Sequence, residues 1–256
     1  MFRPNGLKRL LLSIRNRYPY ANIAVGDDNY TPYPEVSYSI DHSSLMKHHV
    51  FEADLGIGKV LNYILTQIKT EYFVLLEDDF EFSDLTNIET LIAHIENGEF
   101  DISGGACRNY ENGTLGSFQG YFNWDNYPIA PGPYEFYDMK TLTEPKIFDT
   151  IVNFFAARTE DVTPFGWSEE LKVARHVDFF LRAGGWRPRS GKYPVARPLK
   201  VGYNPSVEII HHGKEIEDKE FRRPRDDHRT RRMPEFKQMY LDLWGFLPPP
   251  EGIVET

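Results

Sequence analysis

The sequence has a single cysteine, no long apolar run and no excess of basic residues, and each of these absences excludes a class of protein. Cys107 alone cannot build a disulfide framework or a cysteine zinc site. No stretch approaches the roughly 20 apolar residues of a membrane-spanning helix, and no signal peptide is recognisable. The formal net charge of −9 argues against a general nucleic-acid-binding protein. We therefore expect a cytoplasmic protein or a soluble catalytic domain, with no nucleic-acid partner and no membrane segment.

The chain is large and apolar enough for one α/β domain, since 41% of its 256 residues are hydrophobic. Apolar residues recur at helical spacing in some segments and form short runs in others: helices are predicted near 7–14, 60–68, 85–96 and 175–182, and strands near 22–26, 72–76, 151–156 and 207–210. Asp54 is predicted to cap the second helix. Strands that alternate with helices favour parallel pairing through right-handed crossovers. Residues 107–146 lose this periodicity and are expected to form irregular loops or short antiparallel hairpins.

An acidic triplet follows the most apolar of the predicted strands. Residues 72–76 are all apolar or aromatic, and Glu77, Asp78 and Asp79 come next. Such a run predicts a strand buried on both faces in the middle of a parallel sheet, with the carboxylates at the edge where open α/β folds bind ligands. Three adjacent carboxylates repel one another, and a bound Mg²⁺ or Mn²⁺ would relieve this repulsion while holding substrate phosphates. A solvated acidic turn without a ligand is the alternative interpretation.

A second acidic cluster ends an earlier predicted strand. Asp27 and Asp28 follow residues 22–26, so two parallel strands would bring both clusters to the same edge of the sheet. One cluster would accept hydrogen bonds from a base or ribose while the other holds a metal and a diphosphate, as a nucleotide-sugar donor requires. The same residues also fit an ordinary turn with no ligand.

The order and spacing of these motifs resemble those of the GT-A-fold glycosyltransferases. The matching segments are Phe2-Arg3-Pro4, Gly26-Asp27-Asp28-Asn29, Gly56-Ile57-Gly58-Lys59 with Asn62, and Leu75 to Phe80. In the last of these, Glu77-Asp78-Asp79 is similar to the metal-binding DXD motif. Residues 166–172 and 176–180 resemble the ganglioside-type β-1,4-N-acetylgalactosaminyltransferases, with Val177 where those proteins usually carry Glu. The resemblance covers roughly residues 1–215, and the family's opening strand would precede Arg3.

The resemblance implies a Rossmann-like, mostly parallel central sheet flanked by helices, with an irregular acceptor-side C-terminal half. Within one domain, it implies a nucleotide-sugar-binding half (1–105), an acceptor and catalytic half (106–215) and a charged flap with a helix (216–256). The implied reaction is a metal-dependent, inverting transfer of sugar from a UDP-sugar to a hydroxyl of an oligosaccharide or glycoconjugate, with Mn²⁺ or Mg²⁺ as cofactor.

The resemblance also implies roles for particular residues. Asp178 would be the general base, and Asp178→Asn is expected to lose catalysis while melting near the parent temperature; the alternative is a helix carboxylate paired with Arg175 or Arg182. The other roles are donor contacts from Arg3, Asp27, Asp28, Lys59, Asn62 and Asp78, metal contacts from Glu77, Asp79, His211 and His212, and acceptor contacts from Trp167 and His176. Because side chains of a strand alternate between faces, at most one of the two late histidines is expected in the site.

Two other functions stay open at this point. Nucleotidyltransferases also place carboxylates and a metal at a parallel sheet edge, but they usually carry an early Gly-rich loop with Lys or Arg that this sequence lacks. A non-catalytic glycan- or nucleotide-binding module would fit the aromatic residues between 118 and 137. The resemblance favours UDP-N-acetylgalactosamine as donor, while UDP-xylose, UDP-galactose and UDP-glucose remain alternatives.

Overall fold

The computed structural model describes residues 4–29, 45–116, 120–121, 135–136, 141–171, 175–186, 197–213, 234–235 and 237–244. The helices are α1 (Pro4–Arg17), α3 (Ile57–Gln67), α4 (Ile88–Glu96), α5 (Thr159–Val162) and α6 (Arg175–Ala183), and residues 237–244 are also helical. The strands are β1 (Ile23–Asp27), β2 (Met46–Val50), β3 (Tyr72–Leu75), β4 (Phe80–Phe82), β5 (Ile102–Asn109), β6 (Gly120–Tyr121), β7 (Glu135–Phe136), β8 (Lys146–Phe148), β9 (Phe155–Arg158) and β10 (Val201–His211). None of the helices in these ranges is long and apolar enough to cross a membrane.

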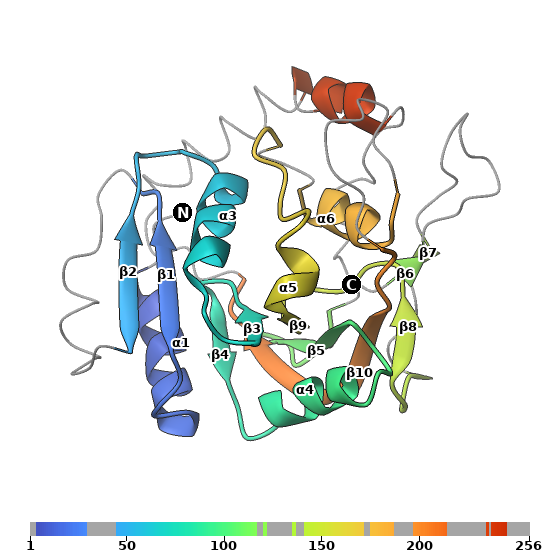
Figure 1. The fold of residues 1–256 in the computed structure, drawn as a ribbon. Helices are drawn as coiled ribbons and strands as arrows, with labels where there is room; N and C mark the ends of the chain where they lie inside the picture. Colours follow the sequence, from blue (N-terminus) through green and yellow to red (C-terminus); the bar gives the residue numbers. More distant parts are fainter. Residues whose placement is uncertain are drawn as a thin grey trace.

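A six-stranded sheet with helices against both faces forms the centre of the molecule (Figure 1). Its strand order is β3-β9-β5-β10-β4, and β8 pairs with β10 beside this path. Side chains of α3, α5 and α6 pack on one face, and side chains of α1 and α4 pack on the other. The α/β class predicted from the sequence is therefore confirmed.

The pairing within this sheet corrects the expected parallel arrangement. In the described residues β3–β9, β5–β9, β10–β4 and β10–β8 are antiparallel, and β5–β10 is the parallel pair. β1 and β2 pair in parallel in a separate two-stranded sheet. The prediction rested on the helix–strand alternation of the first hundred residues. It was wrong because β3 and β5 take their partners from much later in the chain, and local alternation carries no information about those partners.

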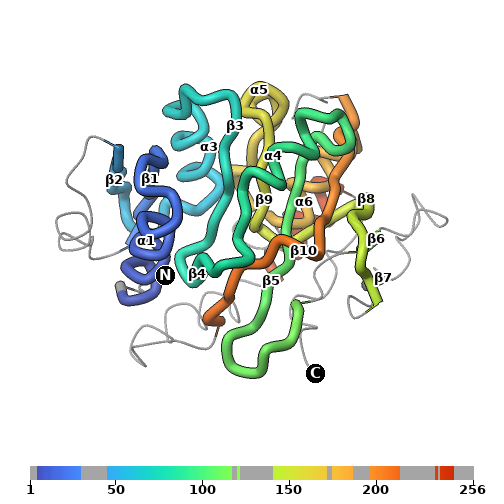
Figure 2. Tube along the Cα trace, turned by 90° about the horizontal axis from the view of Figure 1, so that it is seen from below, coloured from blue at the N-terminus to red at the C-terminus, as the bar shows by residue number. Residues whose placement is uncertain are grey.

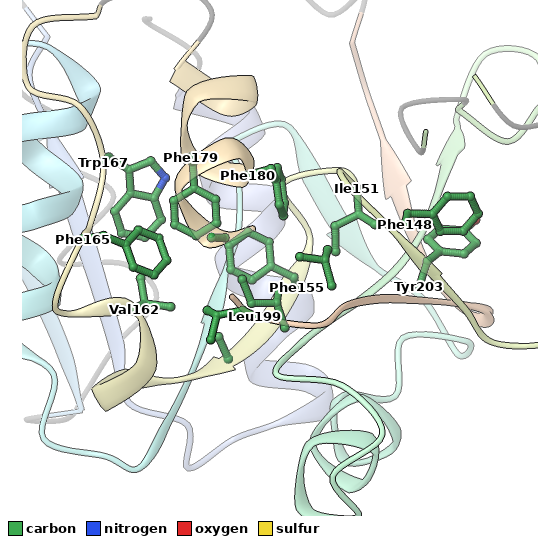
Figure 3. Close-up of a cluster of buried hydrophobic side chains, with 14 of the residues drawn as sticks. Phe148, Ile151, Phe155, Val162, Phe165, Trp167, Phe179, Phe180, Leu199 and Tyr203 are labelled. Atoms are coloured by element: carbon green, nitrogen blue, oxygen red, sulfur yellow. The ribbon is translucent and has the colours of Figure 1, made fainter. Parts of the chain in front are cut away.

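The strands buried on both faces inside the sheet are β9, β5 and β10, not β3. Phe155 of β9 packs into the cluster with α6 (Figure 3). In the same strand, Ala157 packs into that cluster, whereas Ala156 packs into the cluster with α4. β3 lies at the end of the strand order and is half-buried along its length. Its side chains still alternate between the two clusters, Phe73 on one face and Val74 on the other. An end strand covered by helices on both faces therefore has the same apolar pattern as a central strand.

Helix α1 joins the small sheet to the large one. Leu10 and Ile14 pack into the cluster with β4, β9 and α4, while Leu7 and Leu11 pack against β1 and β2. The two views agree that α1, β1 and β2 lie together on one side of the large sheet, opposite β6, β7 and β8 (Figures 1 and 2). The apolar stripe predicted for this helix is confirmed, and its packing is what holds the end of β1 in place.

Strand β10 brings late residues of the chain to the end of β3. It pairs with β5 along its length, and its register slips between Asn204 and Glu208. Its first part also pairs with β8, whereas its last three residues pair with β4, with His211 opposite Phe80 (Figure 1). This register places the two late histidines next to the acidic triplet.

Candidate active site

The acidic triplet lies in the turn that connects β3 to β4, and the end of β10 is hydrogen-bonded to that turn. The backbone N–H of His212 donates to the carbonyl oxygen of Asp79 at 2.9 Å. Beside this bond, His211 Nε2 lies 3.2 Å from Asp79 Oδ2, and Asp79 is only 4% exposed. A Cβ built on Gly213 would lie 2.7 Å from the His211 ring, so a larger residue there would push the ring from its present position. The fold thus holds a buried carboxylate and an imidazole side by side.

His212 makes different contacts from its neighbour. Its Nε2 lies 2.7 Å from Glu81 Oε2, and its ring stacks on Tyr110 with the centroids 4.3 Å apart. Side chains of adjacent strand residues face opposite ways, which explains why the two histidines have separate partners. Of the two histidines predicted as metal ligands, His211 has its ring beside Asp79, whereas the His212 ring contacts Glu81 and Tyr110; metal binding by either stays a prediction.

Glu77 is bound to a residue that the sequence did not single out. The side-chain amide of Asn153 donates to Glu77 Oε1 at 2.7 Å, and its carbonyl oxygen lies 2.7 Å from His176 Nδ1. On the other side of the ring, His176 Nε2 lies 3.4 Å from the hydroxyl oxygen of Thr150. Burial, and then the charge of Arg175, lowers the pKa of His176 to about 4, so the imidazole is neutral at pH 7.

A metal ion at this turn would have to be shared with a ligand. Among the described residues, no group of three or more His, Cys, Asp and Glu side chains is arranged to hold a metal. Asp79 and His211 supply two donors, and Mg²⁺-type ions are commonly held by one or two carboxylates together with substrate phosphates. Burial, followed by the charges of Glu77 and Asp79, raises the pKa of the Cys107 thiol. The donor set fits a divalent ion bound together with a diphosphate.

The second acidic cluster, Asp27 and Asp28, makes hydrogen bonds with other residues of the protein. Asp27, which is 3% exposed, accepts a bond from the backbone N–H of Asn29 at 3.1 Å, and its other oxygen lies 3.1 Å from His48 Nε2. Asp28 accepts a bond from the backbone N–H of Gly56 at 3.1 Å. The bond from Asn29 fits the turn considered as the alternative, whereas His48 and Gly56 come from later in the chain. The predicted contacts of Asp27 and Asp28 with the donor stay predictions.

Two sequence motifs meet where α3 packs against the loop before α6. Asn62 accepts a bond from the backbone N–H of Trp167 at 2.8 Å and donates to its carbonyl oxygen at 2.9 Å. A Cβ built on Gly58 would overlap the carbonyl oxygen of Ser168, so only glycine allows α3 to approach the loop this closely. The Asn62 amide therefore holds the backbone of the loop, and its contact with the donor stays a prediction. Lys59, on the same helix, is exposed.

Helix α3 is also capped by a different residue from the one predicted. The N-cap is Gly56 rather than Asp54, and no side chain caps the first turn. Asp54 instead adopts a left-handed backbone conformation with φ of 56°, and its N–H donates to the carbonyl oxygen of Asp28 at 2.9 Å. The prediction was wrong because Asp54 belongs to the turn that follows β2 and pairs with the end of β1.

Trp167 belongs to the core of the described structure. Its ring is stacked on Phe179, with centroids 4.8 Å apart and planes at 14°, and the residue is 4% exposed (Figure 3). This stack fixes the loop to α6, and Asn62 fixes its backbone to α3. The structure gives the indole a packing role, and contact with an acceptor stays a prediction.

Asp178 is fully buried, on the first turn of α6. It forms an ion pair with Arg182 one turn later, and its Oδ1 accepts a bond from the indole N–H of Trp244 at 3.0 Å. Burial raises the pKa of Asp178 above its ordinary value, against the opposing effects of Arg182 and Trp244. The ion pair proposed as the alternative interpretation is therefore present, and the role of general base stays a prediction.

Comparison with known families identifies the protein family of this chain. The family model described as "Glycosyl transferase family 2" matches residues 2–162, more than half of the chain. The chain belongs to glycosyl transferase family 2. The family resemblance seen in the sequence motifs is thereby confirmed.

Curated relatives are N-acetylgalactosaminyltransferases, though each is a much longer protein. Beta-1,4 N-acetylgalactosaminyltransferase 2 of Mus musculus is 30% identical over 217 residues, which are 82% of this chain and 37% of the relative. Beta-1,4 N-acetylgalactosaminyltransferase 1 of Homo sapiens is 28% identical over 187 residues, which are 70% of this chain and 33% of the relative. The family 2 chain therefore spans about a third of the length of these proteins.

Solved structures agree on the fold. The crystal structure of S. aureus TarS 1-349 aligns with a TM-score of 0.55 at 15% identity, covering 95% of this chain and 64% of that one. The same protein in complex with UDP aligns with a TM-score of 0.54 at 16% identity, covering 83% and 58%. This likeness confirms the expected GT-A fold for the family 2 chain, and at this identity it assigns no residue a role.

Some predicted parts of this family 2 site lie outside the described residues. These are Arg3 and the arginine-rich part of the predicted flap, residues 216–233. The ranges 1–105 and 106–215 stay a prediction, and β5 runs across the boundary between them. Asp78 is half-buried in the turn with Asp79. Asn153 and Thr150 were missed because neither belongs to a local pattern, and only their contacts with Glu77 and His176 distinguish them.

Proposed function

We propose that this chain is the catalytic domain of a metal-dependent, inverting glycosyltransferase that moves a sugar from a UDP-sugar to a hydroxyl of a glycan acceptor. Membership of glycosyl transferase family 2 supports glycosyl transfer. The names of the relatives favour N-acetylgalactosamine as the sugar, and a neighbour of the same fold has been crystallised with UDP. The observation that carries the metal-dependent part is the Asp79–His211 pair, since it joins the acidic triplet to a histidine 132 residues later.

In this proposal Asp79 and His211 hold Mn²⁺ or Mg²⁺, and Glu77 and Asp78 lie in the same turn. Bound there, the ion supplies Lewis-acid stabilisation to the departing diphosphate. The protein's own contribution is a fixed geometry. The bond from the His212 N–H holds the backbone of Asp79, and the close approach of Gly213 limits where the His211 ring can lie. Preorganised ligands of this kind avoid a reorganisation cost during the reaction.

Asp178 is the proposed general base. As the acceptor oxygen bonds to the anomeric carbon, the bond from that carbon to the diphosphate breaks, and the hydroxyl proton passes to the carboxylate. A raised pKa makes Asp178 a better proton acceptor, and burial raises it. Both carboxylate oxygens are engaged, one by Arg182 and the other by Trp244. The acceptor hydroxyl would use a remaining lone pair of this carboxylate, beside the Arg182 and Trp244 contacts.

The test is release of UDP from sugar nucleotides. The chain is incubated with Mn²⁺, a panel of glycan acceptors, and in turn UDP-N-acetylgalactosamine, UDP-xylose, UDP-galactose and UDP-glucose. We expect acceptor-dependent release of UDP from at least one donor, its loss in EDTA, and its loss in Asp79→Asn. A nucleotidyltransferase would instead release pyrophosphate from UTP and a sugar 1-phosphate, and a binding module would release neither product.

A further inference from the structure

A chain of hydrogen bonds connects the acidic turn to α6 through one side chain that has no assigned role. Asn153 lies between the two, with 2.7 Å from its amide nitrogen to Glu77 Oε1 and 2.7 Å from its carbonyl oxygen to His176 Nδ1. Glu77 is two residues before Asp79, and His176 is two residues before Asp178. We propose that Asn153 is a positioning residue that couples the orientation of Glu77 to the tautomer of His176, an inference that rests on the proposed function for its catalytic consequence.

The chemistry of the partners determines which way the Asn153 amide faces. A carboxylate can only accept hydrogen bonds, so the amide nitrogen must face Glu77 and the carbonyl oxygen must face His176. A carbonyl oxygen accepts, so the bond to Asn153 requires the His176 proton on Nδ1; the ring also has a hydrogen bond with the backbone of Ile151. The Nε2 lone pair then remains as an acceptor, with the Thr150 hydroxyl 3.4 Å away. A hydrogen bond at one ring nitrogen fixes the proton on that side in this way.

Turning the amide over would undo both contacts at once. The carbonyl oxygen would then face the Glu77 carboxylate, which is repulsive, and the ring would need its proton on Nε2. Glu77 and His176 therefore do not choose their states independently. Because 3.4 Å is long for a hydrogen bond, Nε2 is also able to exchange Thr150 for a stronger donor, such as a hydroxyl of the acceptor sugar.

The decisive measurement is the tautomer, which does not depend on turnover. The chain labelled with ¹⁵N-histidine is studied at pH 7 by long-range ¹H–¹⁵N NMR, and the His176 signals are assigned by their absence in His176→Gln. We expect the Nδ1–H tautomer in the parent and a shift toward Nε2–H in Asn153→Ala. Thr150→Val, which removes the weaker contact on the other side of the ring, is the matched control and should keep Nδ1–H.

A second variant separates the two halves of the coupling. Asn153→Asp keeps an oxygen toward His176 and replaces the donor to Glu77 by a second carboxylate, so His176 Nδ1 should stay protonated while repulsion moves Glu77 from its present orientation. Loss of such an outer hydrogen bond typically lowers metal affinity or activity ~10–100-fold, and we expect kcat/KM for transfer to fall in this range in both Asn153→Ala and Asn153→Asp.

Three results would overturn the proposal: a parent His176 in the Nε2–H form, an unchanged tautomer in folded Asn153→Ala, or transfer within twofold of the parent in both variants. If the tautomers behave as expected but the parent turns over no UDP-sugar, the coupling is supported and it is the proposed function that fails.

Discussion

Replacing Asp178 by Asn should destabilise the domain as well as remove the proposed base. Arg182 is 2% exposed and also donates to the carbonyl oxygen of Phe165 at 2.7 Å, so it stays buried when its carboxylate partner is neutralised. Breaking a buried ion pair in this way costs about 3–5 kcal/mol. Asn still offers an oxygen to Trp244, which favours the low end of that range. For a domain of this size, each kcal/mol lowers the Tm by about 2–4 °C, so we expect a fall of ~6–12 °C.

The measurement is a thermal melt and a urea titration of the parent, Asp178→Asn, and the double variant Asp178→Asn with Arg182→Met. The double variant removes the unpaired buried positive charge, although it also removes the bond to the Phe165 carbonyl, and should recover part of the lost stability. A single variant that melts within about 2 °C of the parent would refute the buried pair, and would match the expectation drawn from the sequence alone.

The same double variant separates structure from catalysis. If Asp178 is the base, transfer should stay at least ~10²-fold below the parent even when stability is partly restored. Transfer near the parent rate in the stabilised double variant would show that Asp178 is only a structural ion-pair partner, and that the base lies elsewhere.

Two further predictions concern His176 and the α3 contact. The pKa of His176 is about 4 in the folded protein against an ordinary 6.5, so the unfolded chain takes up the proton first as the pH falls. Neutral His176 therefore makes its full contribution to the free energy of unfolding above about pH 6.5, and that free energy falls by about 2 kcal/mol between pH 7 and pH 5. Urea titrations should show that the stability of His176→Gln depends less on pH in this range. Gly58→Ala should cost about 1–3 kcal/mol because its Cβ overlaps the Ser168 carbonyl. Lys59→Ala changes the exposed neighbouring residue and should have the same Tm as the parent. Equal Tm values for Gly58→Ala and Lys59→Ala would contradict the close contact between Gly58 and Ser168.

Sequence reasoning predicted the elements of the fold better than their partners. The stripe of α1, the helix ended by Gly98 and the helix that carries Asp178 each follow from local periodicity and turn residues, which act over a few positions. The position of β3 at the end of the sheet could not be predicted, because its apolar pattern reflects covering helices rather than neighbouring strands.

Some residues of the candidate site could be found from local sequence motifs, and others only from contacts between distant parts of the chain. The acidic turn and the helix of Asp178 are contiguous motifs, and family resemblance was enough to point to them. The choice of His211 over His212 depends on the register of β10 against β4, and the role of Asn153 depends on two contacts across the fold. Asn62 carries a recognisable motif, yet only the structure shows that its amide clamps the Trp167 backbone.

Calorimetric titration of UDP into the chain, with Mn²⁺ and with EDTA, tests the proposed metal site at Asp79 and His211 most directly. The parent should bind UDP at least ~10-fold more tightly with Mn²⁺, because the ion is shared between the protein and the diphosphate. Asp79→Asn and His211→Gln should lose this gain, whereas His212→Gln, in which the contact with Glu81 is lost instead, should keep it. Equal UDP affinity with Mn²⁺ and with EDTA in the parent, or loss of the gain in His212→Gln rather than His211→Gln, would contradict the account.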